Sequence, residues 1–270
     1  MIPSANVLAW GEHAPWPALR QIEQDLIISR ALCDIFSDPL LSSRVAFRGG
    51  TAINKLIFPK PLRYSEDIDL VQTVDEPTGE MIGALRKVLS WLGQCRVSPS
   101  RHSTHLQFRF SPEDSPETSL NIKIEINIAE HQNLFGLRKY PYSVANPWFN
   151  GGAEIVSFDA NELFGTKLRA FLQRRKNRDL FDFQEGLARA TLDAVIVVAA
   201  CQHFLGLEEK TISRAEAEER ILEKFNHDLT EDVVPLLPVG VEFTRQAAVA
   251  AIEAVWKTFV PRLNGASWKL

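Results

Sequence analysis

The chain has 270 residues, of which 45% are hydrophobic and 24% charged. This balance is typical of a folded globular protein and excludes a mainly disordered one. The formal net charge is −4, so no basic field covers the whole molecule and any contact with nucleic acid has to use a local patch.

The cysteines and the apolar runs indicate the cellular compartment of the protein. The chain has three cysteines and no CxxC pair, which excludes a disulfide framework and favours a reducing environment. Its apolar runs are far shorter than the ~20 residues that span a bilayer, and its first residues resemble no signal peptide. We therefore expect a cytoplasmic protein with no membrane partner.

The first half of the chain predicts a mixture of helices and strands. In chain order, the hydrophobic periodicity predicts a helix at 17–36, a strand at 45–47, a short helix at 51–57, a strand at 67–73, a helix at 78–92 and strands at 106–110 and 120–128. From residue 161 to the end the chain reads as almost wholly helical, at 161–176, 179–189, 191–205, 213–226 and 241–260. The expected fold is α+β, with a mixed-sheet core over residues 1–155 and a helical C-terminal domain over 156–270.

Two aspartates on one strand are the first candidates for a site. Asp67 and Asp69 are two residues apart, so on a strand both side chains leave the same face. Two neighbouring carboxylates repel unless a cation lies between them, and hard oxygen ligands suit Mg²⁺, which in turn binds substrate phosphates. The alternative is an exposed strand edge without a metal.

The Gly49-Gly50-Thr51 turn precedes a predicted helix. Bare backbone N–H groups and a positive helix N-terminus suit a phosphate. Taken alone, such a turn is only a connection between elements. Together with a metal-binding pair of carboxylates, it would supply both parts that nucleotidyl transfer needs.

Glu125 extends this candidate site. It lies on the polar face of the 120–128 strand, and if that strand neighbours the one bearing Asp67 and Asp69, three carboxylates converge, as a two-metal site requires. The alternative is a solvated cross-strand pair between Glu125 and a lysine or arginine.

A basic segment forms the second candidate region. Residues 167–178 contain six Lys or Arg and no acid. On a helix, Lys167, Phe171, Arg174 and Arg178 would share one face, suited to a triphosphate or an RNA backbone. The alternatives are a solvated basic helix and, for Asp179, a helix N-cap. We expect His102 and His105 to be surface or turn residues.

Four motifs in order resemble the AbiEii/AbiGii toxin family of nucleotidyltransferases, which includes MenT-like toxins of type IV toxin–antitoxin and abortive-infection systems. The motifs are GGTAINKL, RYSEDIDL, KIEI and LFGTKLRAFLQRRKNRDLFDF. The resemblance implies a nucleotidyltransferase-like core followed by a helical region. It also implies transfer of a nucleotide from an NTP to RNA, at the tRNA 3′ end in several members, and a cognate antitoxin encoded nearby. Tyr64 stands where the family more often has Phe.

The resemblance also assigns roles to residues. Asp67 and Asp69 would hold Mg²⁺ or Mn²⁺, with Glu125 as a third ligand at a position that varies in the family. The catalytic set is Asp67, Asp69, Lys167 and Asp179. The set assigned to nucleotide binding is Gly49, Gly50, Thr51, Ser65, Lys167 and Arg174. Two other functions fit the same residues: nucleotidyl transfer to a protein or small molecule, and a non-catalytic nucleotide-binding module.

Overall fold

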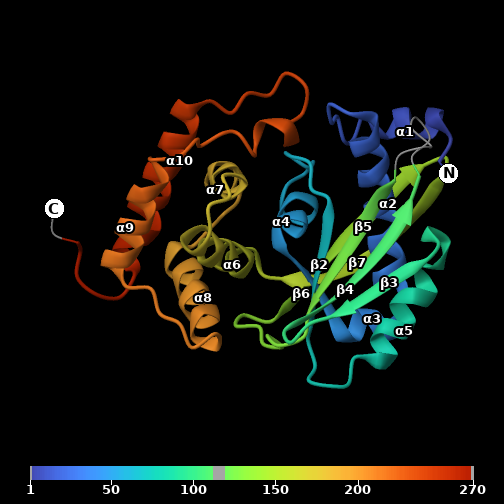
Figure 1. The fold of residues 1–270 in the computed structure, drawn as a ribbon, viewed down its shortest axis with the longest axis horizontal. Coiled ribbons are helices and arrows are strands. Elements are labelled where there is room, and N and C mark those ends of the chain that lie inside the picture. Colours follow the sequence, from blue (N-terminus) through green and yellow to red (C-terminus); the bar gives the residue numbers. More distant parts are fainter. Residues whose placement is uncertain (1, 112–118, 269–270) are drawn as a thin grey trace. The chain divides into compact units, whose positions relative to one another are not determined.

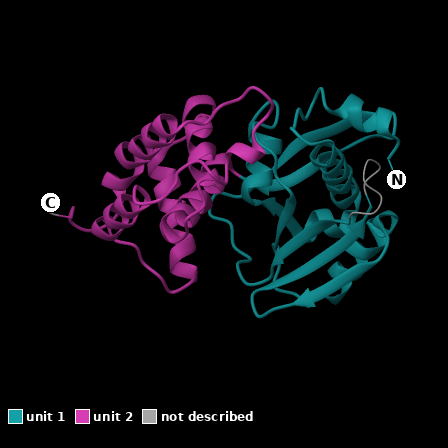
Figure 2. Cartoon of the chain, turned by 45° about the horizontal axis from the view of Figure 1, so that its top comes forward, with its two compact units in different colours: residues 1–158 teal, residues 159–270 magenta. Residues whose placement is uncertain are grey.

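A seven-stranded mixed β-sheet is the central element of the fold in the computed structural model, which describes residues 2–111 and 119–268. The chain divides into two compact units, Met1–Phe158 and Asp159–Leu270 (Figure 2). The sheet belongs to the first unit, and the second is helical. The predicted α+β class is confirmed.

The sheet has the strand order β3-β4-β5-β2-β1-β7-β6 (Figure 1). Two pairs, β2 with β5 and β1 with β7, are parallel, and the others are antiparallel. The strands are β1 (Val45–Arg48), β2 (Asp67–Gln72), β3 (Cys95–Pro99), β4 (Ser103–Phe110), β5 (Leu120–Asn127), β6 (Leu137–Asn146) and β7 (Phe149–Phe158).

One face of the sheet is apolar and the other is polar, because side chains alternate along each strand. On β5, Ile122, Ile124 and Ile126 are fully buried, whereas Lys123 and Glu125 are partly exposed on the opposite face. This confirms the predicted alternation. Figure 1 shows the helices of this unit behind the strands. They are α1 (Ser4–Trp10), α2 (Leu19–Ser37), α3 (Pro39–Arg44) and α5 (Gly79–Val88), followed by a 3₁₀ turn, Ser90–Leu92.

A buried ion pair connects the helical segment that follows β1 to helix α2. The chain runs from α4 (Gly49–Ala52) directly into a π-helical turn, Ile53–Ile57, which carries Lys55. The Lys55 ammonium lies 3.1 and 3.0 Å from the two carboxylate oxygens of Asp25 and 3.0 Å from Ser29 Oγ. Burial would lower the pKa of Lys55, but the neighbouring Asp25 carboxylate raises it. These contacts hold the π-helical turn against α2.

The second unit is built from five α-helices in the part of the chain that is described: α6 (Ala160–Gln173), α7 (Arg178–Arg189), α8 (Ala194–Leu207), α9 (Arg214–Lys224) and α10 (Arg245–Phe259). Helices α6 and α8 approach closely at Gly165, where an added Cβ would lie 2.4 Å from Ala200 Cβ. Phe164, Phe171, Phe183 and Phe259 form the aromatic core of this unit. Among the helices within residues 2–111 and 119–268, none is both long and apolar enough to cross a membrane.

Candidate active site

The glycine turn and the second aspartate meet directly. Gly49 has φ +82°, a conformation that residues with a side chain rarely adopt. A Cβ built on Gly49 would lie 2.1 Å from Asp69 Oδ2 and 2.9 Å from Asp69 Cγ. Residues 20 positions apart in the sequence are thus in contact, because Arg48 at the end of β1 pairs with Asp69 on β2. Only glycine allows the backbone to come this close to the carboxylate.

Two hydroxyl side chains hold the strand that carries the aspartates. Thr51 Oγ1, in the first turn of α4, donates to the backbone carbonyl of Asp67 at 2.7 Å and lies 2.6 Å from Ser65 Oγ. Thr51 is buried. The structure therefore brings the predicted residues of the first unit together around the start of β2, and it gives Thr51 a structural contact that the sequence did not predict.

The residues present fit a divalent cation that is held mainly by its substrate. Asp67 and Asp69 alternate with buried Ile68 and Leu70, so both carboxylates leave the polar face, as predicted. No group of three or more His, Cys, Asp or Glu side chains is arranged to hold a metal in the described part of the chain. Mg²⁺ commonly uses one or two protein carboxylates and completes its shell with phosphate and water, so a pair of protein carboxylates is enough for such a cation.

Glu125 lies beside the aspartates, as the predicted strand pairing requires. Strands β2 and β5 are parallel neighbours, with Asp69 opposite Glu125 and Asp67 opposite Lys123. The Glu125 carboxylate is, however, 2.8 Å from Lys123 Nζ and 3.5 Å from His105 Nε2. Glu125 is therefore paired with a lysine, but Lys123 lies two residues away on the same strand and not across the sheet, as the alternative considered from the sequence had it. Glu125 would have to exchange Lys123 for a metal in order to act as a ligand.

The charges on this face are mutually stabilised. Burial would raise the pKa of Glu125, but the hydrogen bond and charge of Lys123, together with His105, lower it. The hydrogen bond to Glu125 raises the pKa of Lys123, and the nearby Asp67 and Asp69 carboxylates add to that effect. Lys123 is thus a cation placed among three carboxylates. His105 is partly exposed, in keeping with the expected surface position, and it lies on β4 directly opposite Glu125.

In the second unit, the basic segment does not form one helical face. Helix α6 ends at Gln173, and Arg174 has an extended backbone (φ −137°, ψ 168°). The predicted alignment of Lys167, Phe171, Arg174 and Arg178 on one helix was therefore wrong. The helical conformation is interrupted at residues 174–177, before α7 begins. Phe171 belongs to the buried core.

Lys167, Arg174 and Asp179 nevertheless come together. The buried Lys167 ammonium lies 3.0 Å from Asp179 Oδ1 and 2.7 Å from Asp182 Oδ2. Arg174 donates from Nε and Nη2 to the two carboxylate oxygens of Asp179, each at 3.0 Å. Burial would raise the pKa of Asp179, but Lys167 and Arg174 hold it below its usual value. Asp179 is not the N-cap considered from the sequence, since Asn177 holds that position.

Lys224 completes this cluster and was not identified from the sequence. Its ammonium donates to the Arg174 carbonyl at 2.8 Å and lies 4.4 Å from the centre of the Phe171 ring. Burial lowers the pKa of Lys224 to about 8. Asp182 was likewise given no role, although its spacing of three residues from Asp179 places both on one face of a helix and could have indicated a shared partner.

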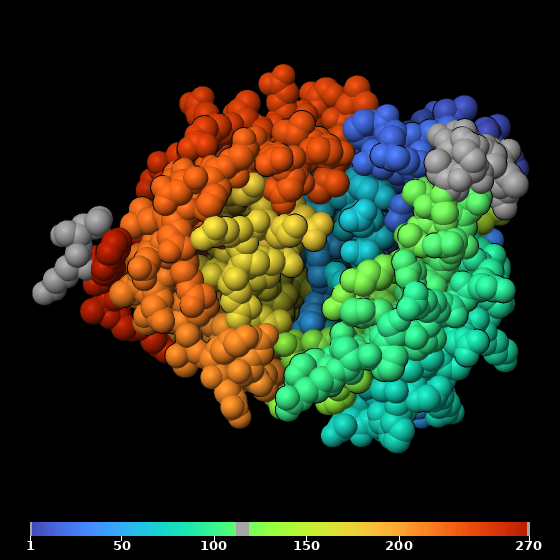
Figure 3. Space-filling view, in the orientation of Figure 1, coloured from blue at the N-terminus to red at the C-terminus, as the bar shows by residue number. Residues whose placement is uncertain are grey.

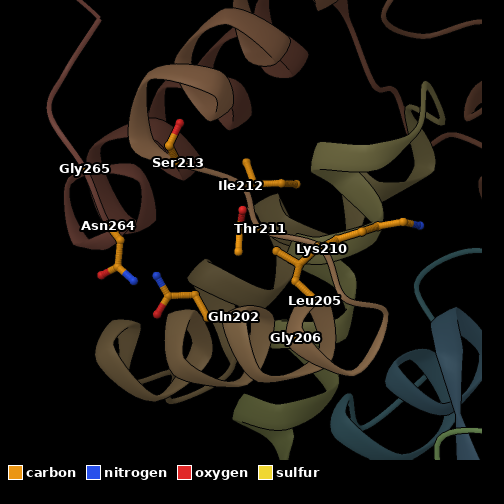
Figure 4. Close-up of a pocket in the computed structure, with 9 residues that line it drawn as sticks. All are labelled: Gln202, Leu205, Gly206, Lys210, Thr211, Ile212, Ser213, Asn264 and Gly265. Atoms are coloured by element: carbon orange, nitrogen blue, oxygen red, sulfur yellow. The ribbon is translucent and has the colours of Figure 1, made fainter.

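A separate pocket of about 390 Å³ lies in the second unit, at the end of α8 and the start of α9 (Figure 4). Its described lining residues are Gln202, Leu205, Gly206, Lys210, Thr211, Ile212, Ser213, Asn264 and Gly265. None of these residues was assigned a role from the sequence, and the pocket is distinct from both clusters described above.

Solved structures from two organisms share this fold. The chain is similar to MenT4, a nucleotidyltransferase toxin from Mycobacterium tuberculosis H37Rv, with a TM-score of 0.63 and 16% identity over 98% of this chain and 91% of that one. It is also similar to a protein from Helicobacter pylori whose structure is described as that of a "putative nucleotidyltransferase", with a TM-score of 0.54 and 14% identity over 89% of this chain and 96% of that one. At these identities the likeness establishes the fold.

The family is established by sequence. The model of the AbiEii nucleotidyl transferase toxins of type IV toxin–antitoxin systems matches residues 30–264. The chain belongs to this family, which confirms the resemblance seen in the four motifs and implies a cognate antitoxin. No curated protein matches the sequence significantly.

Proposed function

We propose that the protein transfers a nucleotide from an NTP to an RNA acceptor, the 3′ end of tRNA, in a reaction that depends on Mg²⁺ or Mn²⁺. The observation that carries this proposal is the direct contact of the Gly49 backbone with the Asp69 carboxylate. It supports the proposal because it brings the glycine turn and the carboxylate pair together at the start of β2. Family membership supports the same chemistry.

Each assigned residue has a role in binding or orientation. Asp67 and Asp69 hold the cation, which neutralises phosphate charge when bound. Backbone N–H groups at Gly49 and Gly50 face the phosphates, while Thr51 and Ser65 keep the start of β2 in place. Lys167 and Arg174 are proposed to contact the triphosphate. For Lys167 this requires partial release from Asp179 and Asp182, whereas the Arg174 side chain is already 44% exposed.

The proposed reaction is an in-line displacement. The acceptor hydroxyl oxygen forms a bond to the α-phosphorus, the bond from that phosphorus to the oxygen bridging to the β-phosphorus breaks, and pyrophosphate leaves. The hydroxyl proton passes to solvent. Catalysis of this kind depends mainly on positioning and charge neutralisation, so the aspartates contribute by fixing the reacting atoms.

The test is a transfer assay with purified protein, Mg²⁺, each of the four α-labelled NTPs in turn, and total cellular RNA. We expect label in a tRNA-sized band, reduced at least about a hundredfold in Asp69→Asn protein. Asp75→Asn is the matched control, because the Asp75 carboxylate is exposed and lies off the β2 strand. Equal activity in the two variants would refute the assignment of Asp69.

Other outcomes of the same assay separate the alternatives. Label in a protein or small molecule would keep the chemistry and replace the acceptor. Label in no product, with nucleotide still bound, would favour a non-catalytic nucleotide-binding module. We further propose that the antitoxin is encoded beside this gene and that both act in the cytoplasm.

A further inference from the structure

One segment of the first unit carries positive charge without any acid. Residues 81–111 contain Arg86, Lys87, Arg96, Arg101 and Arg109, and no Asp or Glu. Since the whole chain has a net charge of −4 and this segment contributes +5, the remaining residues carry −9. A protein that is acidic as a whole therefore has a strongly basic strip, formed by the end of α5, β3 and β4.

These cations are exposed and available to a ligand. All five side chains are exposed, and none forms an ion pair with an acid in residues 2–111 or 119–268. The basic segment at 167–178 differs in this respect. There, four of the six cations are paired with acids, namely Lys167, Arg169, Arg174 and Arg175. The sequence suggested that the positive charge of residues 167–178 binds a polyanion. In the fold, this charge is largely neutralised by the ion pairs.

The strand register connects the basic strip to the candidate active site. Asp67 on β2 is opposite Lys123 on β5, Lys123 is opposite Gln107 on β4, and Gln107 is opposite Arg96 on β3. These residues form one row across the polar face. Three strand spacings of ~4.8 Å place Arg96 about 14 Å from Asp67. A flexible strand whose end lies at Asp67 can reach Arg96 along this row.

A polar pocket lies on the opposite side of the same edge strand, since Cys95, which lines it together with residues of α5, alternates with Arg96. It has a volume of about 550 Å³ and is lined by Arg86, Lys87, Ser90, Gln94 and Cys95, with Gly83 and Gly93. Two cations, a hydroxyl and an amide, with no acid, form a lining that suits phosphate oxygens. Figure 3 shows the surface of β3 and β4 (turquoise to green), which is uncovered in this view.

We propose that Arg86, Lys87, Arg96 and Arg101, which we term the β3-edge patch, bind the sugar–phosphate backbone of the RNA acceptor behind its reacting 3′ end. The identity of the ligand as RNA rests on the proposed function, whereas the location rests on charge, exposure and register. The patch contacts phosphates and so fixes the direction of the strand without reading its sequence. RNA specificity then has to arise elsewhere.

The test measures binding of 5′-fluorescein-labelled deacylated tRNA to the full chain by anisotropy, over a range of salt concentrations. Neutralising two phosphate contacts with Arg96→Gln/Arg101→Gln should lower the slope of log K against log salt by about 1.4 to 1.8. At 0.15 M salt this corresponds to an affinity about 14-fold to 30-fold weaker. The affinity for NTP should stay unchanged.

The matched control is Lys176→Gln/Arg178→Gln, which removes the same charge from the two cations of the 167–178 segment that are not ion-paired in the described residues. We expect it to change tRNA affinity less than threefold. If the control weakens binding and Arg96→Gln/Arg101→Gln does not, the β3-edge patch is not the RNA surface. The same conclusion follows if both variants bind tRNA as the wild type does, as expected for a patch that contacts an acidic antitoxin.

Failure of this inference and failure of the proposed function give different results. Wild-type protein that binds tRNA through the patch but transfers no nucleotide would refute the function and leave the surface standing. Protein that labels tRNA with the same KM for tRNA in Arg96→Gln/Arg101→Gln would leave the function standing and overturn the surface.

Discussion

Replacing Gly49 by alanine should separate backbone strain from damage to the site. The residue has φ +82°, and a side chain in this left-handed region costs about 1–2 kcal/mol of folding free energy. The new Cβ would also lie 2.1 Å from Asp69 Oδ2, where an ordinary contact is at least 3.4 Å. The carboxylate therefore has to move by about 1.3 Å, and a misplacement of about 1 Å can cost a hundredfold in rate.

Gly136→Ala is the matched control for this variant. Gly136 has φ +79°, and an added Cβ there meets no atom within 4 Å. Urea unfolding should show a similar loss of about 1–2 kcal/mol in both variants, while the NTP transfer assay should show at least a hundredfold loss only for Gly49→Ala. Equal activity in the two variants would mean that the position of the Asp69 carboxylate does not limit the reaction, and the reasoning from the glycine contact would be refuted.

Three further predictions concern buried charges. Lys55→Met should lower the free energy of unfolding by about 3–5 kcal/mol in urea titrations, because it leaves the buried Asp25 carboxylate without its cation; a loss under 1 kcal/mol would contradict this. The pKa of Asp179 is lower in the folded state, so its stabilising contribution is present above the unfolded value near ~4 and is lost as pH falls through the folded value. Unfolding free energies measured from pH 7 down to 3 should therefore fall more steeply in wild type than in Asp179→Asn. Burial lowers the pKa of Lys224 from 10.5 to about 8, so between these values the unfolded state holds the proton more strongly and wild-type stability should rise with pH. The same titration of Lys224→Met should be flat over that range, and a parallel rise would exclude Lys224 as its cause.

Local sequence patterns were sufficient to predict the helices and strands that bury one clear stripe of apolar residues. The helices of the second unit and strands β1, β2, β4 and β5 were predicted to within a few residues. Strands β6 and β7 were missed because Pro141, Gly151 and Gly152 resemble turn signals. In the structure these residues lie in a long antiparallel pair, where pairing with a distant partner outweighs local preference. Strand β3 is short, and only Cys95 and Val97 of its side chains face inward even partly.

The candidate site was predictable in composition but not in its contacts. The carboxylate pair and the glycine turn could be linked because each has a chemical reason to accompany the other. A pair between Glu125 and a lysine or arginine was weighed only as an alternative, and across strands, since alternation gives the face of a side chain and not its partner. The extended backbone at Arg174 was not predictable from helical spacing, because residues 167–178 contain no proline or glycine to mark the break.

The two outermost strands of the sheet carry the features that stop a sheet from growing. Strands β3 and β6 lie at its edges, and an edge strand exposes unpaired backbone groups on which another chain can assemble. Each edge contains a proline, Pro99 or Pro141, together with cationic side chains such as Arg96 and Lys139. Proline cannot donate a backbone hydrogen bond, and like charges repel a second copy. The positive charge on β3 thus opposes edge-to-edge aggregation. A variant that neutralises these side chains in order to study ligand binding therefore also loses part of the barrier to self-association at high protein concentration.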